Sequence, residues 1–265
     1  MSNTIKILFI GDIIGRPGRV ALEKKLPGIR AKYSPDLVIA NAENAANGFG
    51  ITERVYEELT ENLKIDVLTS GNHIWDKKEV MQIIESLPKL VRPYNYPSNR
   101  IPGNGFKIVT VKDTQVAIGN LLGCVFMGTY DSPFYAADRM LTEIPADVKI
   151  KLIDMHAEAT SEKKAIGWYL DGRVSAIIGT HTHVQTADER ILPKGTAYIS
   201  DAGMTGGIDS VIGVDKDKII ERFLTQLPIR FEPAEGKACI EGVIIEIDTE
   251  SGHAIQCARV QEFTE

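Results

Sequence analysis

The 265-residue sequence predicts an α/β protein with a buried sheet. Short β-branched runs alternate with amphipathic segments through the first third of the chain, which is the pattern of strand–helix–strand units. These runs are apolar at nearly every position, as expected for strands covered on both faces. With 43% hydrophobic residues, the chain also has enough apolar surface for a sizeable core.

The elements can be placed in order along the chain. Strands are predicted at residues 5–10, 36–40 and 66–70, and helical spacing of apolar residues at 20–33, 53–63 and 76–87. Two closely spaced strands, 106–111 and 115–122, predict a hairpin, and alternation then resumes with strands at 149–157, 174–183 and 196–203 and a helical segment through 167–170. We expect a terminal hairpin at residues 238–260, with its turn at 250–252. We expect residues 127–147 to form a helical cap or a lid. No linker or composition break divides residues 1–265, so we expect one domain.

Charge and cysteine content exclude several classes of protein. A net charge of −6 disfavours a protein that coats nucleic acid or an anionic membrane, since both depend on Lys and Arg. The three cysteines are widely spread without a CxxC pair, which argues against a disulfide framework and fits a reducing cytoplasm. The apolar run before Gly11 is too short for a signal peptide or a membrane span. We therefore expect a soluble cytoplasmic protein.

Residue types that bind metals recur where predicted strands end. Asp12 follows IKILFIG and His156 follows KLIDM, and four of the five histidines occupy such strand-end motifs. Because ligands of open α/β sheets gather beyond the carboxyl ends of the strands, these side chains should converge in space. The set, which has no thiolate, favours manganese, iron or zinc over calcium. The candidate residues are Asp12, Glu43, Asn44, Asn72, His73, His156, His181 and His183.

Each candidate also has a purely structural interpretation. Asp12 or Asn44 alone is more often a turn residue or a helix cap, and His156 alone could be a histidine satisfied in the core. The HTH motif at 181–183 is a stronger signal, because alternate positions of an extended segment point two imidazoles the same way. His253 lies in the terminal hairpin, and we assign it no catalytic role.

The glycine-rich segments do not indicate nucleotide binding by a known loop. GDIIGRPG lacks GxGxxG spacing, and nothing matches GxxxxGK[ST]. The segments at 47–50 and 102–105 are turns. Arg16 could contact a substrate phosphate, but a solvated loop arginine is the simpler interpretation.

The order of the motifs resembles the calcineurin-like metallophosphoesterase superfamily. Its signature of DxH, GDxxD, GNHD/E, a later His and GHxH corresponds here to GDII, NAEN, GNHIWD, DMHAE and GTHTH. Ile14 replaces the His of DxH, and Glu43 replaces the usual bridging Asp, so Asn44 is the natural substitute ligand. NAEN together with GDIIGRPGR resembles the YmdB-like subgroup, and this resemblance runs from Ile5 to near the C-terminus.

The resemblance implies a four-layer α/β/β/α sandwich of two mixed sheets with two metal ions at the strand ends. Iron or manganese is expected, with zinc as an alternative. Glu43 is expected to bridge the ions, and His73 to contact the substrate phosphate. One ion would be held by Asp12, Asn44 and His183, and the other by Asn72, His156 and His181.

The implied activity is hydrolysis of a small phosphodiester such as a 2′,3′-cyclic nucleotide, by attack of a metal-bridging hydroxide. His73 would protonate the leaving oxygen or stabilise charge on the phosphorane. A phosphomonoesterase or nucleotidase is the alternative enzyme. A metal-stabilised regulatory protein that binds nucleotides is the alternative outside enzymes. A homo-oligomer is also compatible with the sequence.

Overall fold

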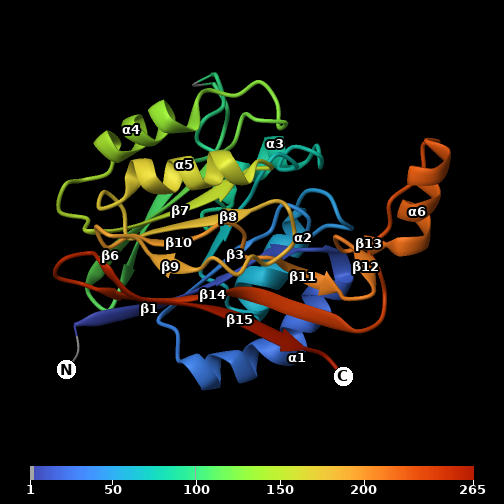
Figure 1. Ribbon diagram of the computed structural model, residues 1–265, viewed down its shortest axis with the longest axis horizontal. Helices are drawn as coiled ribbons and strands as arrows, with labels where there is room; N and C mark the ends of the chain where they lie inside the picture. Colours follow the sequence, from blue (N-terminus) through green and yellow to red (C-terminus); the bar gives the residue numbers. More distant parts are fainter. Residues whose placement is uncertain (1–2, 99) are drawn as a thin grey trace.

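The computed structural model describes residues 3–98 and 100–265. Two β-sheets lie face to face and helices cover the outer face of each, so the layers run α/β/β/α (Figure 1). The four-layer sandwich of mixed sheets that the motif resemblance implied is thus confirmed.

The first sheet has seven strands in the order β2-β11-β14-β1-β3-β4, with β15 paired to β14. β1, β3 and β4 run parallel, whereas β14 is antiparallel to β1 and forms the predicted terminal hairpin with β15. The strands are β1 (Thr4–Ile10), β2 (Asp12–Ile13), β3 (Leu37–Asn41), β4 (Val67–Thr69), β11 (Met204–Gly207), β14 (Ala238–Asp248) and β15 (Ala254–Phe263).

The second sheet has six strands in the order β5-β6-β7-β8-β10-β9. β6, β7, β8 and β10 run parallel, so their carboxyl ends share one edge, and β5 and β6 form the predicted hairpin. The strands are β5 (Phe106–Val111), β6 (Thr114–Leu122), β7 (Ile150–His156), β8 (Ala176–Thr180), β9 (Arg190–Ile191) and β10 (Ala197–Ile199). β12 (Ser210–Val211) and β13 (Val214–Asp215) pair separately.

The helices differ in how closely they follow the predictions. α1 begins at Gly15 rather than at residue 20, since a proline at position 17 is tolerated in a first helical turn. In the region predicted as helix 76–87, only α3 and a short 3₁₀ turn form. The helical elements are α1 (Gly15–Tyr33), α2 (Glu53–Glu57), the π-helix η1 (Glu58–Asn62), α3 (Val80–Ile83), the 3₁₀-helix η2 (Ile84–Ser86), α4 (Pro133–Glu143), α5 (Thr160–Leu170) and α6 (Lys216–Thr225).

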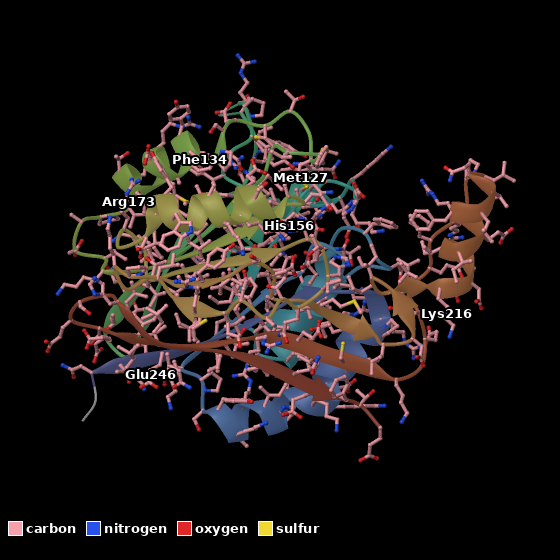
Figure 2. All side chains as sticks on the ribbon, viewed as in Figure 1. Met127, Phe134, His156, Arg173, Lys216 and Glu246 are labelled. Atoms are coloured by element: carbon pink, nitrogen blue, oxygen red, sulfur yellow. The ribbon has the colours of Figure 1, made fainter. Side chains whose placement is uncertain are left out.

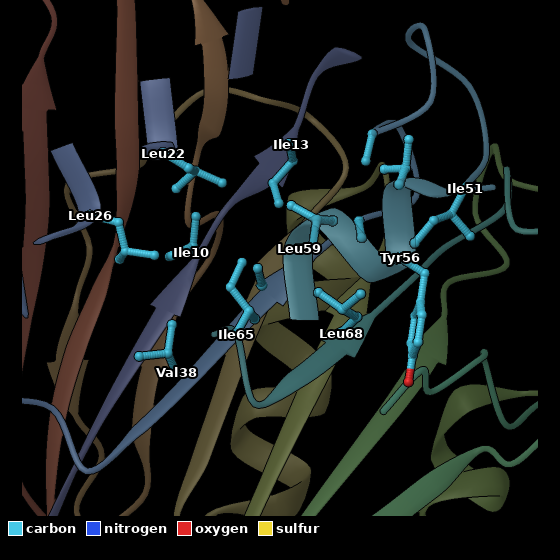
Figure 3. Close-up of a cluster of buried hydrophobic side chains, with 14 of the residues drawn as sticks. Ile10, Ile13, Leu22, Leu26, Val38, Ile51, Tyr56, Leu59, Ile65 and Leu68 are labelled. Atoms are coloured by element: carbon cyan, nitrogen blue, oxygen red, sulfur yellow. The ribbon is translucent and has the colours of Figure 1, made fainter. Parts of the chain in front are cut away.

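Three apolar layers hold the sandwich together. β1 is apolar on both faces because both are covered: Phe9 points into the layer between the sheets, whereas Ile10 points toward the helices. Figure 3 shows the outer layer beneath the helices, where Leu22 and Leu26 of α1 pack near Ile10. Burying one such side chain contributes about 1.5–3 kcal/mol. The third layer lies between the second sheet and helices α4 and α5.

The segment 127–147 and helix α6 differ in how they pack against the sheets. α4 of the predicted cap or lid at 127–147 packs on the second sheet, with Met140 fully buried, so this part is a cap. α6 projects from the body of the molecule (Figure 1) and was not predicted. Among the described helices, none has the length and apolar character needed to cross a membrane.

Candidate metal centre

The candidate residues come from strand ends of both sheets. Asp12 starts β2, two residues after the end of β1, and Glu43 and Asn44 occupy the turn after β3. His156 ends β7 and lies deep within the molecule (Figure 2). The remaining candidates obey the same rule: Asn72 and His73 follow β4, and His181 and His183 follow β8.

Four side chains converge around Nε2 of His156. This atom lies 3.0 Å from Asn72 Oδ1, 3.0 Å from His181 Nδ1 and 3.2 Å from Glu43 Oε1. A single proton on Nε2 can be directed at only one of these three neighbours. Separations of about 3 Å are also the distances between adjacent ligands of an octahedral ion with bonds of about 2.1 Å. A cation among these atoms could therefore be bound by all four side chains at once.

A second group lies on the other side of Glu43. Asp12 is fully buried, and its Oδ1 has no hydrogen-bond partner within the described residues, an arrangement that normally needs a water or an ion. Oδ1 lies 3.8 Å from His183 Nε2. The amide of Asn44 also faces this group, with its nitrogen 3.3 Å from His183 Nε2. A half-turn of that amide exchanges nitrogen for oxygen and so gives a ligand atom at the same place.

Glu43 belongs to both groups. Its ligand atoms and those of His156 and His181 lie within 4.8 Å of one another, and the same limit holds for Asp12, Glu43 and His183. Burial favours the neutral acid, but the charge of His156 outweighs it and lowers the pKa of Glu43. Burial raises the pKa of Asp12. Two buried carboxylates so close together need positive charge, which a metal ion provides.

No side chain fits at position 71, which lies against Glu43 and His156. A Cβ at this position would lie 2.2 Å from Glu43 Oε2 and 2.4 Å from His156 Nε2. Only glycine therefore lets the backbone of the GNH motif approach both groups.

His73 lies beside the two groups without joining their ligand atoms. Its backbone N–H donates to Glu43 Oε2 at 3.0 Å, which fixes the residue to the centre. Its ring Nδ1 is 2.9 Å from Asp76 Oδ2, and the edge of Phe49 packs against the ring with centroids 5.0 Å apart. The side chain remains 29% exposed. With Nδ1–H donated to Asp76, Nε2 is the atom available to a bound substrate.

A match to a family model identifies the family of the chain. The model described as YmdB-like protein matches residues 8–260. The chain belongs to the YmdB-like family. The matched residues include every candidate residue and most of both sheets.

Known proteins similar to this YmdB-like chain are named as enzymes that act on phosphate esters. It is 49% identical over 256 residues to a protein of Bacillus subtilis named 2′,3′-cyclic-nucleotide 2′-phosphodiesterase, covering 97% of this chain and 96% of that protein. A crystal structure of a phosphatase from Mycoplasma pneumoniae is 35% identical with a TM-score of 0.93, covering 99% and 95% of the two chains. A putative 5′-nucleotidase from Staphylococcus aureus shares the fold at a TM-score of 0.59 and 14% identity, over 97% of this chain and 54% of that one.

A chain of hydrogen bonds orients His156 in this YmdB-like protein. Its Nδ1 is 2.9 Å from Thr180 Oγ1, and the Thr180 hydroxyl donates to Asp154 Oδ1 at 2.6 Å. Because that hydroxyl proton is committed to Asp154, the imidazole must donate from Nδ1, which leaves Nε2 as the ligand atom. Burial raises the pKa of Asp154 to about 7. Thr69 and Asn41 hydrogen-bond its other oxygen.

The other two imidazoles are also held by the nitrogen that faces away from the centre. His181 Nε2 lies 3.3 Å from Glu158 Oε2, so Nδ1 faces His156. His183 Nδ1 donates to the carbonyl of Ile212 at 2.9 Å, so Nε2 faces Asp12. Burial lowers the pKa of His181 to about 3, which keeps it in the neutral form that a metal ligand requires.

The HTH motif does not reach the centre as an extended segment, and that prediction is wrong. His181 and His183 have φ angles of 97° and 61°, so the chain turns sharply at both. Asp201 supports the turn by accepting from the backbone N–H and the hydroxyl of Thr182 at 3.0 and 2.7 Å. Asp201 in turn pairs with Lys163 at 2.7 Å, and both side chains are 1% exposed.

Several supporting residues were missed by reasoning from the sequence. Asp154 had one available signal, since a carboxylate in an otherwise apolar strand needs buried partners. Asp201 had the same signal, since it lies in the predicted strand 196–203. Asp76 and Glu158 carry no such signal, because their importance depends on contacts made across the fold. Of the side chains set aside earlier, Arg16 is exposed at the start of α1 and His253 is exposed near the terminal hairpin turn.

Proposed function

We propose that this YmdB-like protein is a dinuclear metal-dependent phosphodiesterase that hydrolyses small nucleotide diesters such as 2′,3′-cyclic nucleotides. The observation that carries the proposal is the convergence of carboxylate, amide and imidazole groups from five strand ends on one buried centre, with His73 beside it. The activity named for the Bacillus subtilis relative supports the same substrate class.

The ligand assignment follows the two groups of side chains. Asp12, Asn44 and His183 would hold one ion, and Asn72, His156 and His181 the other, with Glu43 between them. Nitrogen and oxygen donors without thiolate fit iron or manganese, with zinc as the alternative. Two such ions supply positive charge that binds a phosphate and lowers the pKa of water.

The protein's own residues contribute position and protons. Glu158, Thr180 and the Ile212 carbonyl hold three imidazoles in the required orientation, so little reorganisation is needed when substrate binds. His73 would donate from Nε2 to the leaving alkoxide oxygen, while Asp76 stabilises the charged ring through Nδ1. Removing such a proton donor typically lowers turnover by about 10²–10⁴-fold. We therefore expect His73→Ala to retain its metal but lose most of its activity on substrates with poor leaving groups.

The decisive experiment compares Glu43→Gln with wild type in metal content and in hydrolysis of 2′,3′-cyclic AMP. We expect about two ions per chain and turnover in wild type, and loss of both in the variant. Glu85→Gln, at an exposed site on the 3₁₀ turn η2, is the matched control. Full activity of Glu43→Gln would contradict the bridged centre.

The same assay separates the alternatives. Faster hydrolysis of a monoester such as 3′-AMP than of the cyclic diester would identify a phosphomonoesterase. Metal binding without turnover of either substrate would identify a regulatory protein that binds nucleotides.

A further inference from the structure

Three loops beside the metal centre each carry an aromatic side chain. Trp75 lies in the loop after β4, three residues beyond Asn72, and Tyr130 lies in the loop after β6. The latter loop starts at the centre itself, because the N–H of Gly123 donates to the carbonyl of His156 at 2.9 Å. Tyr96 comes from a third segment, which follows the fully buried Asn95.

The three rings contact one another in series. Trp75 and Tyr96 have centroids 6.2 Å apart, and Tyr96 and Tyr130 have centroids 5.4 Å apart at 89°. Such edge-to-face contacts are favourable for aromatic pairs. Burial raises the pKa of both phenols, and the charge of Glu43 adds to both shifts.

Buried hydrogen bonds keep two of these loops together. The side-chain nitrogen of Asn95 donates to the carbonyls of Leu122 and Asp131, each at 2.8 Å. The oxygen of the same amide accepts from the N–H of Leu122 at 2.8 Å. One buried side chain therefore fixes both ends of the loop that carries Tyr130, and the ring positions are set before any ligand binds.

The loop also displays an exposed aromatic ring. Phe126 is 89% exposed and has a φ of 62°, which bulky residues rarely adopt. Strained backbone and a large exposed apolar side chain are both costly, and strain of this kind is often retained at ligand sites.

Two arginines near Tyr96 and Tyr130 are already engaged. Arg92 donates to the backbone carbonyls of Pro93, Ile101 and Pro102, and Arg139 pairs with Asp131 at 2.8 Å. These two side chains are therefore not free to bind a nucleotide, whereas the flat, apolar base can still be bound by the aromatic rings.

We propose that Trp75, Tyr96, Tyr130 and Phe126 form an aromatic wall that stacks on the nucleobase of a substrate whose phosphate lies at the metal centre. This inference rests on the proposed function and names the part of the substrate that the wall recognises. Stacking on aromatic side chains accepts any base, because every base presents a π-face. The wall should therefore discriminate nucleotides from sugar phosphates rather than one base from another.

Kinetics with and without a base test the proposal. Substrates are 2′,3′-cyclic AMP and the 2′,3′-cyclic phosphate of methyl riboside, which has no base, with product formation followed by phosphorus NMR. We expect Phe126→Ala and Tyr130→Leu each to lower kcat/KM for 2′,3′-cyclic AMP about 5- to 100-fold. For the substrate without a base, kcat/KM should stay within about twofold of wild type. Tyr135→Ala, which removes a 70% exposed ring from α4, is the control. Equal losses on both substrates, or no loss on either, would overturn the proposal.

A binding measurement separates this proposal from the proposed function. The chain has two tryptophans, so Trp168→Phe leaves Trp75 as its sole indole. We expect 2′,3′-cyclic AMP, but not the cyclic phosphate without a base, to quench Trp75 fluorescence in the metal-loaded protein. Quenching without turnover would refute phosphodiester hydrolysis and keep the wall. Turnover without quenching would refute the wall and keep the hydrolysis, and the absence of both would refute both.

Discussion

The buried ion pair behind the HTH motif makes a quantitative prediction for stability. Lys163 Nζ lies 2.7 Å from Asp201 Oδ2, and both side chains are 1% exposed. Lys163→Met removes the cation and leaves a buried carboxylate. Breaking a buried pair in this way costs about 3–5 kcal/mol. Asp201 keeps donors from Thr182 and from the N–H of Gly203, so we expect a loss of about 3 kcal/mol, at the low end of that range.

Urea denaturation of metal-free protein measures this loss without a contribution from bound ions. Arg173→Met is the control, because the Arg173–Asp138 pair has a similar charge separation of 2.6 Å but is about 40% exposed (41% and 39% for its two side chains). That variant should lose about 0–1 kcal/mol. The double variant Lys163→Met/Asp201→Asn should recover part of the loss, since no buried charge remains unpaired. If Lys163→Met costs no more than Arg173→Met, the pair does not support the loop.

The remaining predictions concern the metal centre directly. In Gly71→Ala the added methyl meets Glu43 and His156, so elemental analysis should show a large loss of metal, and a fully loaded variant would contradict the packing described. Glu158→Gln removes the carboxylate beside His181 and should weaken metal binding about 10- to 100-fold in a chelator competition; affinity equal to that of Glu85→Gln would exclude an orienting role. Burial opposes charge on His156, but Glu43 overcomes this and raises its pKa to about 9. Metal must therefore displace a proton below that pH, so affinity should rise from about pH 7 to about pH 9; proton release into weak buffer measures this, and no release would show a neutral ring.

The strand-end positions of the centre could be predicted because a parallel sheet imposes them. An apolar run followed by Asp12 or His156 places that side chain at the carboxyl edge whatever the rest of the chain does. The layer order needed the motif resemblance as well, since alternation alone does not say how two sheets stack.

The local geometry could not be predicted from spacing. The HTH motif was expected to be extended, but both histidines adopt positive φ. Asp201 holds Thr182 between them, and Lys163, also distant in sequence, pairs with Asp201. No helix was predicted at the projecting α6, although Asp215 caps its first turn. Its apolar residues Phe223 and Leu224 are exposed at 73% and 80%, and spacing alone does not show that this helix leaves the body of the molecule.

The centre draws its side chains from both halves of the sandwich. Asp12, Glu43 and Asn72 extend from the first sheet, whereas His156 and the HTH motif extend from the second. Ions bound there would cross-link the two sheets, and each could bind only while the sheets remain in register. Unfolding free energy should then depend on free metal concentration, so that a shortage of metal would lower the population of folded protein as well as its activity.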